Sequence, residues 1–320
     1  MYVIGVDGGG TNSRAAAAFV TASGLDRESA VIQGNGSNPR AVGFEQMREE
    51  LTELLSSLLK AHSIRAGDVA GICCGLAGAG RLHDQLRAQA ELRKAVSQLG
   101  ISASACIDVY ADSVTALEGA IPGPGEGILI IAGTGSNAIG RTKTGDLFHC
   151  GGWGHLLGDE GGGYRIGLEA LQAVVRAADG RASPTSLTSS LLSFFGLQEP
   201  EDLVSFVYEH AGKREIASAA PLVMEAAEGG DEAAAGIVHQ AVEELCLHVR
   251  SLHDQAGTFS PHVPVAAEGS LIKQAPGFQK QFRHLLKADG LGTWAESAAD
   301  PLEGALQLAA RRIYDTGKVR

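Results

Sequence analysis

The feature that most constrains the fold of this chain is a pattern that occurs twice: an apolar strand, a tight turn of glycine and hydroxyl residues, and a returning strand. In the first copy the turn Asp7–Thr11 (DGGGT) lies between predicted strands over 2–6 and 14–20. In the second copy the turn Gly133–Asn137 (GTGSN) follows a predicted strand over 127–132. The repetition predicts two α/β lobes, each of which opens with a hairpin.

The residues between the two copies alternate between strand and helix periodicity. They predict strands over 30–33, 69–76 and 104–109, and helices over 43–62, 82–98 and 112–120. The Pro122–Gly125 cluster then ends the first half, because proline and glycine together break a helix. We therefore expect one lobe over 1–120, completed by a C-terminal helix over about 302–320, and a second lobe over 121–301.

The second lobe is expected to be mostly helical. Apolar periodicity predicts helices at about 158–178, 184–195, 199–211, 219–228 and 231–256. A short strand over 263–267 is followed by Glu268, Gly269 and Ser270, where the chain turns from a strand into a helix. Such a turn offers a shelf on which a flat ring can rest.

Charge and cysteine usage exclude several classes of protein. The net charge is −11 and no run of lysine or arginine occurs, so a nucleic-acid partner is not expected. The five cysteines are an odd number without a CxxC pair, which argues against a disulfide framework or a structural zinc site. No secretory leader precedes the first strand, and no apolar run reaches the roughly 20 residues that span a bilayer. We expect a soluble, cytoplasmic protein without a membrane partner.

The two turns have the composition of phosphate-binding loops. Glycines let backbone N–H groups approach an anion, and the hydroxyl of Thr11 or Thr134 adds a donor. Asp7 stands at the end of its strand, where a carboxylate can hold Mg²⁺ through water. Neither turn is a Walker loop, and neither opens a βαβ unit in the Rossmann manner. Two such turns in two lobes suit a polyphosphate bound between two hairpins.

The order of the motifs along the chain resembles that of a known superfamily. The strings are DGGGTNSR from Asp7, a mid-chain aspartate before a helix, GTGSN from Gly133, GGWGHLLGDEG over Gly151–Gly161, and AAEGS up to Ser270. Over essentially its whole length the chain resembles the actin/hexokinase/Hsp70 superfamily, and within it the BadF/BadG/BcrA/BcrD group with its N-acetylglucosamine kinase branch. The resemblance implies an α/β, two-lobed actin-like ATPase (ribonuclease H-like) fold with an interlobe cleft.

The resemblance also implies roles for individual residues. Nucleotide-binding roles fall on Gly9, Gly10, Thr11, Asn12, Gly133, Thr134, Gly135, Gly269 and Ser270, and the metal-binding role falls on Asp7. Sugar-binding roles fall on Ser37, Asn38, Asp112, Asn137, Trp153, Gly154 and Asp159. Trp153 lies between glycines and is expected to stack on a sugar ring or frame the cleft rather than fill the core. The implied cofactors are ATP and Mg²⁺, and the implied assembly is a homodimer.

The catalytic base of this family is an aspartate at the start of the helix after the fifth strand, and two residues are candidates. The segment from Val109 to Leu117 aligns Asp112 with that position, whereas Asp108 is expected within or at the end of the strand. Family members often carry Asn-Asp or Thr-Asp there, where this chain has Ala111 before Asp112. A helix start favours an ionised carboxylate, so Asp112 is the preferred base.

The resemblance implies a kinase that transfers the γ-phosphate of ATP to the 6-hydroxyl of N-acetylglucosamine or a closely related amino sugar. Glucosamine and N-acetylmuramic acid are alternative acceptors, because one sequence does not show the pocket for the acetamido group. A dehydratase-activating ATPase is a further alternative, although Cys73, Cys74 and Cys106 do not have the spacing that its iron–sulfur cluster needs. A non-catalytic, nucleotide-dependent sensor is the last alternative.

Overall fold

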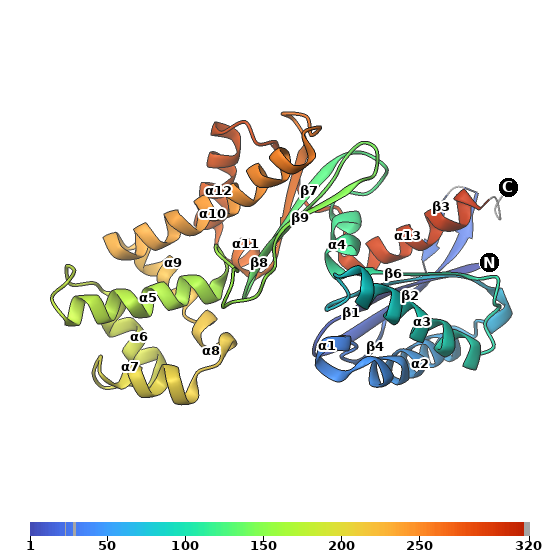
Figure 1. The fold of residues 1–320 in the computed structure, drawn as a ribbon, viewed down its shortest axis with the longest axis horizontal. Coiled ribbons are helices and arrows are strands. Elements are labelled where there is room, and N and C mark those ends of the chain that lie inside the picture. Colours follow the sequence, from blue (N-terminus) through green and yellow to red (C-terminus); the bar gives the residue numbers. More distant parts are fainter. Residues whose placement is uncertain (23, 28–29, 317–320) are drawn as a thin grey trace. The chain divides into compact units, whose positions relative to one another are not determined.

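The computed structural model describes residues 1–22, 24–27 and 30–316. The chain divides into two units, and Figure 1 labels many of their helices and strands. Unit 1 comprises residues 1–123 together with the segment that starts at residue 297, and unit 2 comprises residues 124–296. Each unit is built on its own sheet.

The sheet of unit 1 has the strand order β3-β2-β1-β5-β6, and β4 also pairs with β2. The strands are β1 (Tyr2–Gly8), β2 (Asn12–Thr21), β3 (Gly24–Arg27), β4 (Ile32–Asn35), β5 (Val69–Leu76) and β6 (Cys106–Ala111). Strands β1, β5 and β6 run parallel, whereas β2 runs antiparallel to β1 because the first glycine turn reverses the chain. The carboxyl ends of the three parallel strands therefore meet at one edge of the sheet.

Helices cover both faces of this sheet (Figure 1). They are α1 (Pro39–Val42), α2 (Phe44–Ala61), α3 (Leu82–Gln98), α4 (Asp112–Ala120) and α13 (Pro301–Asp315), with a 3₁₀ turn at Ala66–Asp68. Successive strand residues point to opposite faces, so Ile4 and Cys74 pack on the side of α2 and α3. Val3 and Cys73 pack on the side of α13. Burial on both faces explains why β1 and β5 read as continuous apolar runs.

Helices α4 and α13 pack with their backbones very close together. A Cβ at position 304 would lie 2.0 Å from the carbonyl oxygen of Thr115, so Gly304 is required at this crossing. Nearby, the buried carboxylate of Glu118 on α4 forms an ion pair with Arg311 on α13. The same carboxylate accepts a hydrogen bond from the backbone N–H of Gly123 at 3.0 Å. Glu118 thus joins the last helix of the chain to the point where unit 1 leads into unit 2.

The sheet of unit 2 has the order β11-β10-β7-β8-β9. Its strands are β7 (Gly127–Ala132), β8 (Ser136–Arg141), β9 (Leu147–Gly151), β10 (Pro264–Glu268) and β11 (Thr293–Trp294). Its helices are α5 (Gly163–Ala178), α6 (Leu187–Phe195), α7 (Asp202–Ser205), α8 (Lys213–Ala217), α9 (Ala220–Glu228), α10 (Glu232–Ala256), α11 (Ser270–Gln274) and α12 (Pro276–Ala288), with a π-helical turn at Phe206–His210. The long helix α10 supplies a buried stripe that includes Val238, Val242, Leu245 and Val249.

Both predicted hairpins are confirmed, and the helices expected over 82–98 and 112–120 have those bounds. The helix predicted from 158 is wrong at its start, because Asp159 and Gly161 have positive φ angles and the helix begins only at Gly163. The prediction also lacked β3, β9 and α12. Residues 317–320, the expected end of the last helix, lie outside the described residues. Among the described helices, none has the length and apolar character needed to cross a bilayer.

Replacing Arg311 by methionine should destabilise the protein by on the order of 3 kcal/mol, because the buried Glu118 carboxylate loses its cation. Urea unfolding at pH 7 measures the loss. The matched control is Arg27→Met, which removes an exposed 3.1 Å ion pair to Glu303 on the same helix α13 and should cost less than about 1 kcal/mol. Equal losses in the two variants would contradict a special role for the buried pair.

Candidate active site

The parallel strands of unit 1 bring three chain segments to one edge. Gly8, Leu76 and Ala111 are paired in a single row across β1, β5 and β6, and each is the last residue of its strand. The residues that follow them, including Gly9 and Asp112, therefore leave the sheet side by side. Ligands of open α/β sheets bind at this carboxyl edge.

The first glycine turn presents its tip to solvent. Gly9 donates its N–H to the carbonyl of Asn12 at 3.0 Å and closes the hairpin, whereas Gly10, Thr11 and Asn12 are exposed. A Cβ at position 36 would lie 2.4 Å from the carbonyl oxygen of Gly10, so Gly36 lets the loop after β4 lie directly against the turn. Residues 9–12 thus form an open backbone surface that suits an anion.

The loop after β4 also places the two predicted sugar residues of unit 1. Ser37 donates its N–H to the carbonyl of Gly9 at 3.1 Å, which puts it next to the turn. Its hydroxyl is fully buried and pairs with that of Ser13 at 2.8 Å. Asn38 accepts the N–H of Arg40 with Oδ1 at 2.9 Å and caps α1, which leaves its amide nitrogen for other partners. Ser37 thus supports the loop, and Asn38 is the member of the pair that can face a ligand.

Asp112 opens α4 immediately beyond the sheet edge. Its Oδ1 accepts the N–H of Ser113 at 2.8 Å. Solvent reaches this side chain, yet protein atoms surround it densely, as expected for a carboxylate in a concave site. This desolvation raises the pKa of Asp112, the hydrogen bond from Ser113 opposes the rise, and the negative charge of Asp7 adds to it. A raised pKa at a ligand-binding edge is typical of a catalytic acid or base.

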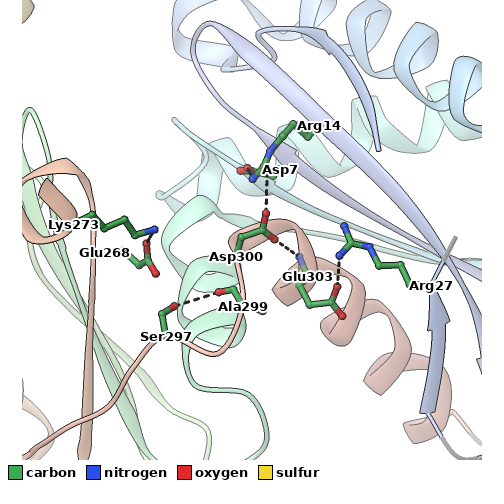
Figure 2. A network of polar contacts seen from close by, with 9 residues as sticks. All are labelled: Asp7, Arg14, Arg27, Glu268, Lys273, Ser297, Ala299, Asp300 and Glu303. Atoms are coloured by element: carbon green, nitrogen blue, oxygen red, sulfur yellow. Dashed lines mark hydrogen bonds and ion pairs between the residues drawn. The ribbon is translucent and has the colours of Figure 1, made fainter. Parts of the chain in front are cut away.

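Asp7, the predicted metal ligand, is held by a cation. Arg14 faces it in the cross-strand pair of β1 and β2 and donates to its Oδ2 at 2.7 Å. Arg14 also pairs with Asp300 at 2.9 Å, and Asp300 caps α13 by accepting the N–H of Glu303 at 3.0 Å (Figure 2). This chain of contacts fixes the Asp7 carboxylate at the edge of the sheet.

The donor set near Asp7 fits a magnesium ion that arrives with phosphates. Mg²⁺ uses one or two carboxylates and keeps its remaining positions for water and phosphate oxygens. Asp7 and Asp112 lie close enough for their charges to interact. Within residues 1–22, 24–27 and 30–316, no group of three or more side chains forms a protein cage for a metal. An ion carried by the nucleotide matches these residues better than a resident metal does.

Asp108 is placed differently from Asp112. It lies within β6, on the face covered by α13, and its carboxylate is 3.8 Å from the guanidinium of Arg312. Burial raises its pKa, and the nearby arginines Arg312 and Arg93 oppose this. Asp108 therefore does not share the carboxyl edge of the sheet with the glycine turn.

The second glycine turn is anchored to the start of α5. Gly133 donates its N–H to the carbonyl of Gly135 at 2.9 Å. The carbonyls of Gly133 and Thr134 accept the N–H groups of Gly163 at 2.8 Å and Tyr164 at 2.9 Å. These bonds fix the turn, and Thr134 remains exposed at its tip.

The turn after β10 lies against the second glycine turn. Gly269 has a φ of 105°, and a Cβ there would lie 2.3 Å from the carbonyl oxygen of Ala132, the last residue of β7. The hydroxyl of Ser270 lies 3.7 Å from the position that a Cβ on Gly133 would take. The predicted phosphate turn and the predicted adenosine turn are thus neighbours in unit 2.

These two turns border a cavity of about 520 Å³. That volume lies in the range of small-molecule sites. Helices α8, α9, α11 and the start of α12 close the cavity with both apolar and polar side chains. Residues that the sequence analysis did not single out include Arg214, Ser218, Met224, Glu225 and Gln274. They come from segments that carry no sequence motif, so the local sequence did not indicate that they line a cavity.

The predicted sugar residues of unit 2 include Asn137 at the start of β8 and the loop that follows β9. The Oδ1 atom of Asn137 is buried and, among the described residues, has no hydrogen-bond partner, so a ligand donor would satisfy it. Gly151 and Gly152 have positive φ angles and lie against Asn137. Trp153 is 70% exposed, which agrees with its expected absence from the core. Gly154 follows in the same loop, with a φ of 87°.

Asp159 is buried, whereas Trp153 of the same predicted sugar-binding set is exposed. Its carboxylate lies against Gly135 of the second turn, and its Oδ2 pairs with the ammonium of Lys213 at 2.7 Å. Lys213 is 54 residues away in the sequence and belongs to no motif, so sequence reasoning did not find it. The structure thus groups Asn137 and Asp159 around the second turn, and adds Lys213 to them.

Known proteins resemble this chain over nearly all of its length. A model of the BadF/BadG/BcrA/BcrD ATPase family matches residues 4–309. An N-acetylmuramic acid/N-acetylglucosamine kinase of Clostridium acetobutylicum is 33% identical over 287 residues, which cover 89% of this chain and 90% of that protein. An N-acetyl-D-glucosamine kinase of Dictyostelium discoideum is 30% identical over 263 residues, with 79% and 80% covered.

A solved structure supports the same relationship. A candidate N-acetylglucosamine kinase from Chromobacterium violaceum superimposes with a TM-score of 0.72 at 27% identity and covers 96% of this chain and 98% of that one. With the two α/β units, this likeness confirms the expected fold class. Because the family model and the relatives span most of the sequence, the chain belongs to the BadF/BadG/BcrA/BcrD ATPase family.

Proposed function

We propose that this protein is an ATP-dependent kinase that transfers the γ-phosphate to the 6-hydroxyl of N-acetylglucosamine or a closely related amino sugar. The observation that carries the proposal is the position of Asp112, which follows β6 at the same sheet edge as the first glycine turn. A kinase needs a carboxylate beside its phosphate site, because the acceptor hydroxyl loses a proton as it attacks the γ-phosphorus.

In this proposal the nucleotide is assigned to the cavity of unit 2. The adenosine enters this cavity beside Gly269 and Ser270, and the phosphates lie against the second glycine turn, which borders it. Asp7 would hold a hydrated Mg²⁺, which neutralises phosphate charge when it is bound. Arg14 keeps the Asp7 carboxylate oriented toward the edge of the sheet.

Asp112 is the proposed base, and Asp108 is not. Asp112 reaches solvent at the carboxyl edge, where an acceptor hydroxyl can approach the first turn. Asp108 faces α13 and Arg312, away from that edge. A base with a raised pKa also accepts a proton more readily than an ordinary aspartate does.

The substrate class is supported by the relatives and by one atom of the site. The relatives are named for N-acetylglucosamine, for N-acetylmuramic acid and, at 27% identity in Vibrio cholerae, for glucosamine. The buried Oδ1 of Asn137 has no hydrogen-bond partner in the described part of the chain and needs a donor, which a sugar hydroxyl or an acetamido N–H supplies. N-acetylglucosamine is therefore the proposed acceptor, and glucosamine and N-acetylmuramic acid are the alternatives. A cytoplasmic homodimer stays a prediction.

A cysteine-bound iron–sulfur cluster fits the described residues poorly. Cys73 and Cys74 are both fully buried and point to opposite faces of the unit 1 sheet. Burial raises the pKa of both thiols, which disfavours the thiolates that a cluster needs. The dehydratase-activating alternative therefore has no support at these positions.

A sugar panel tests the proposed function directly. ADP release should be measured with glucose, glucosamine, N-acetylglucosamine, N-acetylgalactosamine and N-acetylmuramic acid. We expect the highest kcat/KM for N-acetylglucosamine. If no sugar raises turnover above the rate with ATP alone, the kinase proposal is wrong and a nucleotide-dependent sensor becomes the better description.

Replacing Asp112 by asparagine should abolish phosphotransfer while nucleotide binding persists, because the base is lost and the phosphate turns are not. In the wild type, the acid limb of the kcat/KM profile should lie above the ordinary aspartate pKa of about 4, because the pKa of Asp112 is raised. Retained turnover in the variant would move the base to Asp108 or Asp159.

The same substitution has a predicted effect on stability. A raised folded-state pKa means that the ionised Asp112 is disfavoured by folding, so its contribution to stability is fully present at low pH and is lost as pH rises through the folded pKa. Asp112→Asn should therefore have a higher Tm than wild type at pH 7, and the difference should shrink in acid. Thermal unfolding across pH measures it, and a lower Tm at pH 7 would contradict the raised pKa.

Replacing Gly269 by alanine should weaken nucleotide binding about tenfold or more, because the new Cβ meets the Ala132 carbonyl and the φ of 105° strains any other residue. Calorimetric titration with a non-hydrolysable ATP analogue checks this. Gly236→Ala is the control, since a Cβ there meets no atom within 4 Å and the residue lies in α10 away from the cavity. An unchanged nucleotide affinity in Gly269→Ala would contradict the assignment of the adenosine site to this turn.

A further inference from the structure

The carboxylate of Asp159 is confined against the second glycine turn. Its side chain is 6% exposed, and a Cβ on Gly135 would lie 2.5 Å from Oδ2 and 2.8 Å from Oδ1. The backbone of Asp159 has a φ of 65°, in the left-handed region that non-glycine residues seldom adopt. Unusual backbone conformations of this kind often accompany functional sites.

Lys213 is the cation that meets this carboxylate. Its ammonium lies 2.7 Å from Oδ2, and it is the single ion-pair partner recorded for Asp159 in the described part of the chain. The neighbouring Glu160 is engaged through its backbone carbonyl, which accepts the hydroxyl of Ser136. Oδ1 of Asp159 accepts none of the recorded hydrogen bonds among the described residues, and it is not among their buried orphan atoms. Oδ2 is thus occupied by Lys213, and Oδ1 remains available as an acceptor.

The position of Lys213 is set by the packing of α8 on α5 in unit 2. Lys213 begins α8, and Arg214, Ala217 and Ser218 of the same segment line the cavity. A Cβ at position 167 of α5 would lie 2.1 Å from the carbonyl oxygen of Ile216, so α8 packs directly on α5. The start of α5 in turn holds the second glycine turn. Lys213 therefore belongs to α8, which lines the cavity and packs on the helix α5 that holds the second glycine turn.

We infer that Lys213 is a positioning residue of the phosphotransfer site, which holds the Asp159 carboxylate oriented so that Oδ1 accepts a hydroxyl of the acceptor sugar. This inference rests on the proposed function and deepens it. The ion pair of Lys213 with Oδ2 fixes the direction of the carboxylate, and Oδ1 is left to accept from the sugar rather than from the nucleotide. Asp159 and Lys213 would then act on sugar recognition and leave ATP binding to the turn and the cavity.

The experiment compares Lys213→Met with Lys213→Arg. Methionine keeps the apolar stem and removes the charge, so we expect the KM for the sugar to rise at least tenfold. The Kd of a non-hydrolysable ATP analogue, measured by calorimetry without sugar, should stay within twofold of wild type. Arginine restores the cation and should recover most of the sugar affinity. Lys143→Met is the control for loss of a lysine from unit 2, because Lys143 is exposed and its partner Glu126 lies 3.6 Å away.

A second variant separates positioning from folding. Lys213→Met leaves a buried carboxylate unpaired and can destabilise unit 2. The double variant Lys213→Met with Asp159→Asn has no unpaired carboxylate. Its Tm should therefore return toward that of wild type, while the KM for the sugar stays high. The same high KM in Asp159→Asn alone would show that the two residues act as one unit.

Each outcome has a distinct meaning. A wild type without sugar-dependent ADP release rejects the proposed function itself. A wild type with normal turnover and a Lys213→Met variant with unchanged sugar KM reject only the role of Lys213. A loss of nucleotide affinity with unchanged sugar KM would overturn the inference and make Lys213 a phosphate ligand. A recovered sugar KM in the double variant would reduce the pair to a structural contact.

Discussion

The structure of both glycine turns depends on backbone contacts that leave no room for a side chain. Gly36 lies against the carbonyl of Gly10, and Gly269 lies against the carbonyl of Ala132. In each unit the glycine allows a second loop to pack directly on the turn of that unit. A Cβ at either position would separate the loops by displacing backbone rather than a flexible side chain. The layout of the site thus follows from steric exclusion.

The charges of the site follow a common arrangement in the two units. Asp7 beside the first turn is held by Arg14, and Asp159 beside the second turn is held by Lys213. In each pair one carboxylate oxygen is occupied by the cation, which fixes the direction of the other. Asp112 has no recorded cation partner within the described residues, and burial raises its pKa. Asp112 thus differs from Asp7 and Asp159, whose carboxylates each pair with a cation.

Much of the fold could be predicted because its signals are local. The apolar run and glycine turn of β1, the stripe of α2 and the start of α4 at Asp112 are each encoded within a few residues. The prediction was wrong over 158–162, where the φ angles of Asp159 and Gly161 are positive and the helix begins only at Gly163. The Asp159 side chain packs against Gly135 and pairs with Lys213, which both lie outside the local segment from which a helix is predicted.

The sequence by itself determined the two hairpins, the order of the motifs and the chemical types available at each turn, because these depend on neighbouring residues and on composition. Only the tertiary structure decided that Asp112 rather than Asp108 lies at the sheet edge with the first turn, and that Lys213 meets Asp159. It also decided which helices close the 520 Å³ cavity. The physical reason is that strand register and helix packing bring together residues whose separation along the chain carries no information about their distance in space.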